Sequence, residues 1–403
     1  MKNIAIVGAG YRCYEMFAKP LSKDYDNVRI AAVCDPNPGR TEFYRNTLDK
    51  DIKEYSDFDK MLEEVKPDAV IVTTVDAYHH VYIIKALEAG IDVFTEKPIT
   101  IDEEKCLLIR EAEKKSGKKV TVTFNCRFMP YYAKIKEIVK SGAIGKPLAV
   151  DYEYTLNNVH GGDYFKRWHR SLENCGGMMV HKATHHFDIV NWILEDDPVS
   201  VSAEGARLFY GNDDRPHGER CSTCEYKNTC ECYDDFYNDT LIKGLYFNNE
   251  KYDGYVRDDC VFKKNTDIYD YMSVSVKYSK GAILSYSLDL FAQQEGYTLN
   301  VTGTTGRLCA SFYPDDSNFY EIVIKRRDNA SETYRFEKET GSHAGGDERL
   351  RDMLFGDKGT NDPLGQCSTS YDGIKSALIG IAANKSIKEG RRIDLTEILK
   401  KVK

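Results

Sequence analysis

The first 125 residues alternate short apolar runs with amphipathic stretches. The runs are Ile4 to Gly8, Ile30 to Cys34, Ala69 to Thr73, Asp92 to Thr95 and Val120 to Phe124. Each is brief and mostly apolar or β-branched, as strands buried on both faces are. The stretches between them, such as Asp57 to Val65 and Asp102 to Lys115, repeat apolar residues at helical spacing, and Thr100 to Glu103 has the composition of a capped helix start. The order predicts a doubly wound α/β domain with a parallel sheet over residues 1–125.

The pattern changes from Leu148 onward to long alternating runs, which predict antiparallel strands. Examples are Tyr271 to Tyr278, Ala282 to Leu290, Tyr297 to Gly303 and Tyr320 to Lys325. We expect one helix at about 180–194 and another at about 370–389. Residues 126–403 are therefore predicted to form an α+β domain with a large, mostly antiparallel open sheet. A polar stretch at about 211–267 lacks both periods and is interpreted as an insertion.

Composition narrows the class of partner. The 403 residues carry a net charge of -8, which argues against nucleic acid or an anionic membrane surface as a partner. No apolar run approaches the roughly 20 residues that span a bilayer, and Met1 to Ile4 leads directly into a strand. We expect a cytoplasmic protein with a small-molecule partner and, despite 12 cysteines, reduced thiols.

The first strand ends in a glycine-rich turn, Gly8-Ala9-Gly10-Tyr11-Arg12-Cys13. Such glycines allow a tight strand-to-helix turn and let backbone amides approach a pyrophosphate, so Gly8, Gly10, Tyr11 and Arg12 are candidate dinucleotide ligands. Asp35 closes the second strand, where an acidic residue binds the ribose 2′-hydroxyl and repels a 2′-phosphate. NAD is favoured over NADP, although Arg40 lies nearby. The alternative is that Asp35 only begins the turn that follows it.

Thr95-Glu96-Lys97-Pro98 follows the fourth apolar run, where open parallel sheets bind ligands. From there Lys97 can reach a nicotinamide and a substrate. Taken alone, Glu96 and Lys97 would be interpreted as a solvated ion pair.

Together these motifs resemble the glucose-fructose oxidoreductase and inositol dehydrogenase family (Gfo/Idh/MocA) over essentially the whole chain. The matching segments, besides the glycine turn and Glu96-Lys97-Pro98, are Thr73 to His79, Ala86 to Gly90, Asn125 to Phe128, Gly142 to Pro147 and Gly303 to Gly306. The resemblance implies a Rossmann domain, followed by a domain whose open sheet makes homodimer or homotetramer contacts. It places the cofactor against Thr73, Thr74, His79, Glu96 and Asn125, and turns Lys97 and Arg127 toward nicotinamide and substrate.

A second signature of the family is an Asp, three residues and then a His on the first helix of the substrate domain. Here His185 matches the histidine, while His181 stands at the Asp position. A spacing of four predicts both rings on one helix face, with Asp188 behind them. We expect His185 to accept the hydroxyl proton, helped by His181 or Lys182, and Lys97 to stabilise the alkoxide. The alternatives are a metal-binding histidine pair or a structural core histidine.

Two further places carry candidate substrate contacts. Tyr164 to Arg170 combines donors with an aromatic plate, so Trp168 and Arg170 are candidate sugar ligands; an ordinary strand-end cluster is the alternative. His343, at the head of a late helix, is a candidate for closing the pocket.

Five of the cysteines gather between residues 221 and 260. We predict that Cys221, Cys224, Cys230 and Cys260 hold a structural zinc ion, with Cys232 as a substitute ligand. An iron–sulfur cluster and free or redox-active thiols are the alternatives.

The function expected from these features is NAD-dependent oxidation or reduction of a secondary hydroxyl on a sugar, sugar derivative or cyclitol. One alternative is a redox-neutral enzyme that cleaves a glycoside through a transient keto-sugar. The other is a non-catalytic dinucleotide-binding sensor.

Overall fold

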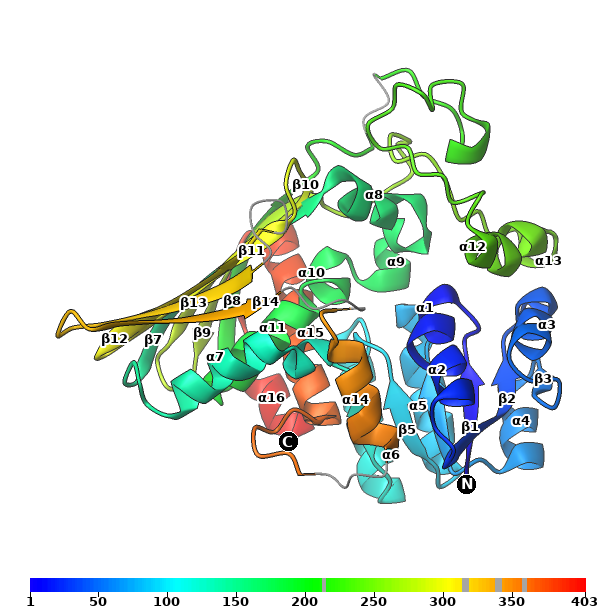
Figure 1. Cartoon of the computed structure of the whole chain (residues 1–403), viewed down its shortest axis with the longest axis horizontal. Coiled ribbons are helices and arrows are strands. Elements are labelled where there is room, and N and C mark those ends of the chain that lie inside the picture. The colour runs from blue at the N-terminus through cyan, green and yellow to red at the C-terminus, as the bar shows by residue number, and fades with distance from the viewer. Residues whose placement is uncertain (212–214, 314–318, 338–342, 357–360) are drawn as a thin grey trace.

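A computed structural model describes residues 1–211, 215–313, 319–337, 343–356 and 361–403. Within these residues the chain forms two sheets, one in each half of the molecule, joined by helices (Figure 1). The predicted α/β organisation, with a parallel sheet followed by a larger and mostly antiparallel one, is confirmed. None of the described helices is both long and apolar enough to cross a membrane.

The first sheet has the strand order β15-β6-β5-β4-β1-β2-β3. Its strands are β1 (Lys2–Val7), β2 (Val28–Cys34), β3 (Lys53–Tyr55), β4 (Ala69–Val72), β5 (Asp92–Thr95), β6 (Val120–Val122) and β15 (Ser368–Thr369). All pair in parallel except β15, which adds antiparallel to β6 from the far end of the chain. All five predicted strands are present. The edge strand β3 was missed, because its three residues include Lys53 and Glu54 and show no apolar run.

Helices cover both faces of this sheet. They are α1 (Tyr11–Cys13), a π-helical turn (Tyr14–Ala18), α2 (Lys19–Lys23), α3 (Pro38–Thr47), α4 (Phe58–Val65), α5 (His79–Glu88) and α6 (Glu103–Ser116). Side chains cap three of them: Asn37 accepts from an amide of α3, Asp57 from α4 and Asp102 from α6. The helix start expected near Thr100 is thus made by Asp102.

The second sheet has the order β14-β13-β12-β11-β7-β10-β9-β8-β16, and only β7 and β10 pair in parallel. Its strands are β7 (Pro147–Asn157), β8 (Pro198–Ala206), β9 (Tyr271–Tyr278), β10 (Ile283–Ala292), β11 (Gly296–Gly303), β12 (Gly306–Phe312), β13 (Phe319–Arg326), β14 (Ser331–Glu337) and β16 (Ile393–Asp394). Buried and exposed side chains alternate strictly along β9, so one face packs against the protein and the other is open.

The remaining helices follow β6 along the chain. They are α7 (Pro130–Lys140), α8 (Asn158–Lys166), α9 (Leu172–Cys175), α10 (Met178–His181), α11 (Thr184–Leu194), α12 (Thr240–Leu245), α13 (Glu250–Asp253), α14 (Gly346–Phe355), α15 (Ser370–Glu389) and α16 (Thr396–Val402). α15 contacts β8 and α11 as well as β6, so it packs against both sheets and fixes them relative to each other.

The single helix expected at about 180–194 is wrong in one respect. It is broken at Lys182 and Ala183, so that His181 ends α10 and His185 lies in the first turn of α11. The two histidines therefore do not share a regular helix face.

The predicted insertion joins β8 to β9, and its residues 212–214 lie outside the described part. Asp270 closes its base by accepting the backbone N–H groups of Leu208, Phe209 and Tyr210. The segment extends away from the sheet and then returns through α12 and α13, which lie beside α1 and α3 (Figure 1).

Candidate functional site

The glycine-rich turn is held tightly against the neighbouring strand. Gly8 has φ +94°, and a Cβ there would lie 2.6 Å from the backbone of Thr73. The hydroxyl of Thr73 donates to the carbonyl of Gly8 at 2.8 Å, and the hydroxyl of Tyr44 donates to that of Gly10, also at 2.8 Å. Only glycine fits the first position, so the turn has the close approach that a pyrophosphate needs.

Asp35 is buried at the end of β2 and faces this turn. Its carboxylate accepts the N–H of Ala9 at 2.8 Å and the N–H of Asn37 at 2.9 Å, and Arg40 lies 3.5 Å away. Burial raises the pKa of Asp35, while Arg40 and the two amides oppose that shift. Asp35 therefore shapes the turn that follows it, as the alternative predicts, and it also holds the glycine-rich turn through Ala9.

A network of charges links the glycine turn to a late helix. Arg12 donates to Glu96 at 2.8 Å and to Asp347, in the first turn of α14, at 2.9 Å. Asn125 donates its amide N–H to Asp347 at 2.6 Å. The pKa of Asp347 is far below its usual value, because Arg12 and His343 outweigh burial. Arg12 and Glu96, both predicted to contact the cofactor, thus form an ion pair with each other.

One atom of that network is left for a ligand. The amide oxygen of Asn125 is buried and has no hydrogen-bond partner among the described residues. An N–H group of a bound cofactor can satisfy such a buried acceptor, beside the glycine turn and Asp35 in the same half of the protein. The residues present therefore fit a dinucleotide.

His79 differs from the expectation of a cofactor contact. The ring is buried, with Nδ1 2.7 Å from the carbonyl of Pro98 and Nε2 3.0 Å from that of Thr74. It ties the loop after β4 to the loop after β5, so it positions Thr74 and Lys97 instead of facing the cleft.

Lys97, His181 and Asp76 form a chain of proton-carrying groups. The Lys97 Nζ lies 3.5 Å from His181 Nε2 and donates to the His181 carbonyl at 3.0 Å. On the other side of the ring, Nδ1 lies 2.6 Å from the Asp76 carboxylate. Burial raises the pKa of Asp76, and the charge of Lys97 opposes that shift. With Asp76 ionised, its carboxylate accepts the ring proton on Nδ1, and Nε2 is the acceptor that faces Lys97.

Burial lowers the pKa values of both nitrogen bases, Lys97 and His181. It lowers the pKa of Lys97 to about 8, although Asp76 and Glu96 raise it. Burial and the charge of Lys97 together lower the pKa of His181. A lysine that titrates near physiological pH beside a neutral imidazole can take a proton from a hydroxyl and pass it on.

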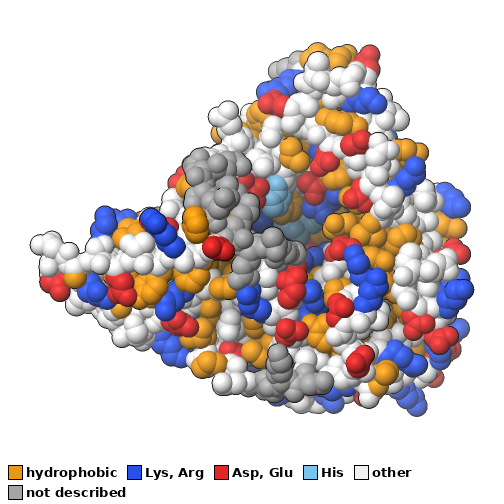
Figure 2. Space-filling model, in the orientation of Figure 1, with side chains coloured by type: hydrophobic (Ala, Val, Ile, Leu, Met, Phe, Trp, Pro, Cys, Tyr) orange, Lys and Arg blue, Asp and Glu red, His pale blue; other side chains and the backbone are white. Residues whose placement is uncertain are grey.

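His185 and His169 flank this chain. Each is buried and has a ring nitrogen, Nδ1, without a partner among the described residues. His185 lies edge-on to Phe124 and 6.5 Å, between ring centroids, from His343. Burial, with the charges of Lys97 and Lys182, lowers the pKa of His185. Histidine side chains are visible in a hollow near the centre of one face of the molecule (Figure 2).

Arg127 does not face the cleft as expected, and Asp188 does not stand behind the histidines. The Arg127 guanidinium donates to both Asp188 oxygens, at 2.7 and 2.6 Å, and to the carbonyl of Gly365 at 3.0 Å. Both side chains are almost fully buried. The two residues form a structural ion pair that joins the segment after β6 to α11.

Removing one partner of this pair tests that role. Asp188→Ala leaves the buried guanidinium with Asp372, 3.6 Å away, as its remaining carboxylate, so we expect the free energy of unfolding to fall by about 3 kcal/mol. Denaturant unfolding measures the change. The paired substitution of Arg127→Leu with Asp188→Leu is the control and should lose less; an Asp188→Ala protein as stable as the wild type would contradict the assignment.

The three other candidate substrate ligands, Arg170, Trp168 and Lys182, differ in the contacts they make. Arg170 donates to Asp259, Asn265 and the Cys260 carbonyl, so it anchors the insertion and is not free for a substrate. Trp168 stacks on His169, with ring centroids 3.5 Å apart, and its contact with a sugar stays a prediction.

Lys182 is partly buried, and its Nζ lies 5.3 Å from the centre of the Tyr154 ring. Burial alone would lower its pKa, but Tyr164, Tyr154 and Glu295 raise it. It therefore stays charged, and as a cation it does not accept a proton.

The cysteines of the insertion come together without forming a ready metal site. One cavity of about 30 Å³ is lined by His217 and by all five cysteines of the insertion, Cys221, Cys224, Cys230, Cys232 and Cys260. Cys260 is brought there by backbone pairing, since its N–H donates to Glu219 and that of Cys221 to Asp258. Within the described ranges, however, no three His, Cys, Asp or Glu side chains are grouped so as to hold an ion, and zinc is not confirmed.

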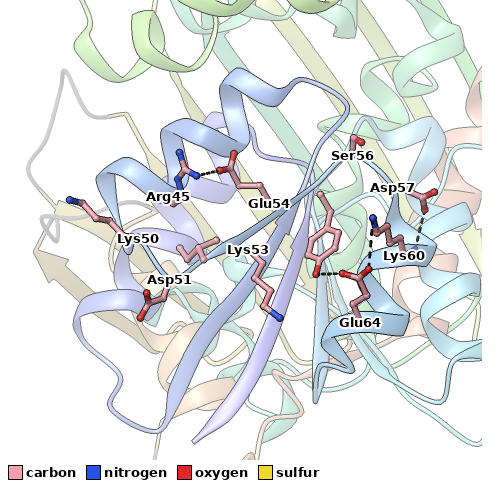
Figure 3. Close-up of a pocket in the computed structure, with 11 residues that line it drawn as sticks. Arg45, Lys50, Asp51, Lys53, Glu54, Ser56, Asp57, Lys60 and Glu64 are labelled. Carbon is pink, nitrogen blue, oxygen red and sulfur yellow. Dashed lines mark hydrogen bonds and ion pairs between the residues drawn. The ribbon is translucent and has the colours of Figure 1, made fainter.

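Another hollow lies at the edge of the first sheet, around β3 (Figure 3). Its charged side chains largely satisfy one another: Arg45 pairs with Glu54 at 2.7 Å, and Glu64 accepts from Tyr55 at 3.0 Å. None of the predicted site residues lines it. We assign no ligand to this hollow.

The residues that sequence reasoning missed are Asp76, His169 and Asp347. Asp76 lies inside the motif Thr73 to His79 and was available as a carboxylate after a strand end. Nothing in the sequence indicated that it meets His181, 105 positions later. Asp347 follows two glycines at a helix start, a signal of local structure but not of its partner Arg12.

Comparison with known proteins agrees with this arrangement. Residues 2–124 match a family model described as "Oxidoreductase family, NAD-binding Rossmann fold", and residues 136–395 match its C-terminal alpha/beta domain. The putative oxidoreductase YteT of Bacillus subtilis is 36% identical over 99% of both chains. The scyllo-inositol 2-dehydrogenase (NAD(+)) of Bacillus subtilis is 32% identical over 51% of this chain and 57% of that enzyme.

Solved structures share the fold at low sequence identity. A probable dehydrogenase from Thermotoga maritima superposes with a TM-score of 0.66 at 22% identity, covering 98% of this chain and 99% of that one. A scyllo-inositol dehydrogenase from Lactobacillus casei, solved with NAD(H) and scyllo-inositol, has the same TM-score at 17% identity, with coverage of 98% and 99%. The chain therefore belongs to the Gfo/Idh/MocA oxidoreductase family.

Proposed function

We propose that this protein oxidises a secondary hydroxyl of a sugar, sugar derivative or cyclitol with NAD as the hydride acceptor. The observation that carries the proposal is the chain of Lys97, His181 and Asp76 at the carboxyl ends of the parallel strands. Curated relatives named as inositol dehydrogenases support a polyhydroxylated ring as the substrate class.

The roles follow from the contacts. When bound, NAD supplies the acceptor for a hydride from the carbon that carries the hydroxyl. Neutral Lys97 takes the hydroxyl proton, and His181 Nε2, 3.5 Å away, receives it in turn. The Asp76 carboxylate stabilises the imidazolium that forms, since it accepts from Nδ1. We assign His185 and His169 to the other hydroxyls of the substrate, because each has a ring nitrogen that no described residue satisfies.

Asp35 sets the cofactor preference in this proposal. Its carboxylate accepts hydrogen bonds from a ribose 2′-hydroxyl and repels a 2′-phosphate. Arg40 does not offset that preference, because its guanidinium pairs with Asp253 at 2.6 Å. Binding titrations with NAD and NADP test this, and tighter binding of NADP would contradict it.

A screen of hexoses, uronates, inositols and glycosides with NAD tests the reaction itself. The proposal expects reduced nicotinamide to accumulate in proportion to ketone product. Product without net reduction would indicate the redox-neutral route through a transient keto-sugar. NAD binding with no product from any substrate would favour the sensor.

We also propose that the cysteine cavity takes up a structural zinc ion, with Cys221, Cys224, Cys230 and Cys260 as ligands. The shared cavity and the backbone pairing that delivers Cys260 support this, although the side chains must close around the ion.

Metal analysis tests that assignment. We expect about one zinc ion per chain in the purified protein, because a tetrahedral cysteine site binds the ion tightly. Cys224→Ser should release the ion, whereas Cys309→Ser, in β12, should not. A protein that is metal-free as isolated and stays so after zinc is added would contradict the site.

Self-association through the second sheet remains a proposal as well. The open face of that sheet carries the exposed side chains of Tyr271, Ile283 and Phe319. Light scattering should report a dimer or a tetramer.

A further inference from the structure

Part of the insertion is built into the dinucleotide-binding half of the molecule. α12 contacts α3 and α1, and Leu245 is fully buried in the core that the helices of the first sheet share. Gly244 lies against the Phe43 ring, where a Cβ would come within 2.3 Å. A segment so closely packed is a fixed wall of this half of the protein and not a loose surface loop.

Polar contacts fix the same wall beside the ribose position. Asn37 donates to the carbonyl of Asn249 at 3.1 Å, and Arg40 pairs with Asp253 at 2.6 Å. Arg40 also lies near Asp35, at 3.5 Å. Residues of the insertion thus hold the side chains that surround Asp35.

Tyr246 is the residue of this wall that contacts the glycine-rich turn. Its hydroxyl accepts the backbone N–H of Tyr11 at 2.8 Å, and a Cβ on Gly10 would lie 3.2 Å from the same oxygen. Its ring lies beside the Arg40 guanidinium, 5.4 Å from ring centre to the guanidinium carbon. The Tyr246 oxygen therefore occupies the edge of the place where this fold binds a pyrophosphate.

That hydroxyl still has a hydrogen bond to give. A tyrosine hydroxyl accepts and donates at once, and none of the described residues accepts the proton of Tyr246. A phosphate oxygen resting on the helix start beside Tyr11 would lie within its reach. Hydrogen bonds to charged acceptors are the stronger ones, so the contact would add appreciably to affinity.

We propose that the insertion forms part of the cofactor site, with Tyr246 donating its hydroxyl proton to the pyrophosphate of the dinucleotide. The inference rests on the proposed use of NAD. With the wall in place the pyrophosphate is covered on a side that the glycine turn alone leaves open, and the cofactor leaves slowly between turnovers.

Tyr246→Phe tests the contact, because it removes one oxygen atom and keeps the ring. We expect the Kd for NAD and for ADP-ribose to rise about tenfold or more, as the loss of a hydrogen bond to a charged group does. The rate at which NADH dissociates, followed by its fluorescence after mixing with excess NAD, should rise in parallel. Tyr252→Phe is the matched control, since Tyr252 lies in the same insertion with an exposed side chain, and it should change neither value.

The outcomes separate this inference from the proposed function. Unchanged Kd values in Tyr246→Phe overturn the inference while leaving NAD binding by the wild type intact. Tighter binding in Tyr246→Phe also overturns it, and would show that the hydroxyl competes with the phosphate. A wild-type protein that binds neither NAD nor ADP-ribose would overturn the proposed function together with the inference.

Discussion

Lys97→Ala should abolish turnover while NAD still binds. Neutral Lys97 is the first proton acceptor of the proposed relay, and once protonated it is the cation beside the reacting oxygen, so its loss removes both functions. We expect kcat to fall about 10³-fold or more, at the combined range of those two effects. Steady-state kinetics and a binding titration measure the two quantities on the same preparation.

Lys85→Ala is the matched control for this variant. Lys85 lies in the same domain, on α5, and pairs with the exposed Asp59 at 2.6 Å. Its removal should leave kcat unchanged. Normal turnover in Lys97→Ala would remove Lys97 from the mechanism.

The pH profile of the wild type adds a second observable. Because burial lowers the pKa of Lys97 to about 8 and the neutral amine is the proton acceptor, alcohol oxidation should rise with pH up to about 8 and then level off. Reduction of the corresponding ketone requires the protonated amine and should fall over the same range.

Asp76→Asn should lower turnover about 10² to 10⁴-fold, as the loss of an orienting carboxylate behind a catalytic histidine does in other enzymes. An amide at this position neither fixes the His181 tautomer nor stabilises the imidazolium. Asp76 also raises the pKa of Lys97, so the rising limb of the pH profile should move to lower pH in the variant. A purely structural role of Asp76 would not shift that limb.

Asp59→Asn is the control for this carboxylate, because Asp59 is exposed and lies on α4. An Asp76→Asn protein with wild-type turnover and an unchanged pH profile would contradict the relay. Thermal unfolding of both variants shows whether the fold is kept.

The parts of the site that depend on local backbone geometry could be predicted from the sequence. Gly8 is required by a turn that closes on Thr73, and Asp35 and Lys97 stand at strand ends that the apolar runs already marked. Strand β9 was predicted at its observed bounds because its alternation is strict.

The parts that depend on distant partners could not be predicted. Arg127 was assigned to the substrate, but it finds Asp188 61 positions later; Arg170 likewise finds Asp259, 89 positions later. The apolar residues of this segment keep a helical period, so the sequence does not indicate the helix break at Lys182 that separates His181 from His185. The carboxylate missing from the family's Asp position comes instead from Asp76, on another strand end.

The most direct test of the central claim is a measurement of reduced nicotinamide and ketone product together, with purified protein, NAD and the panel of sugars and cyclitols. The account predicts that at least one polyol gives both in equal amounts, and that Lys97→Ala gives neither while retaining NAD. Bound NAD with no reduction and no product across the panel would contradict it.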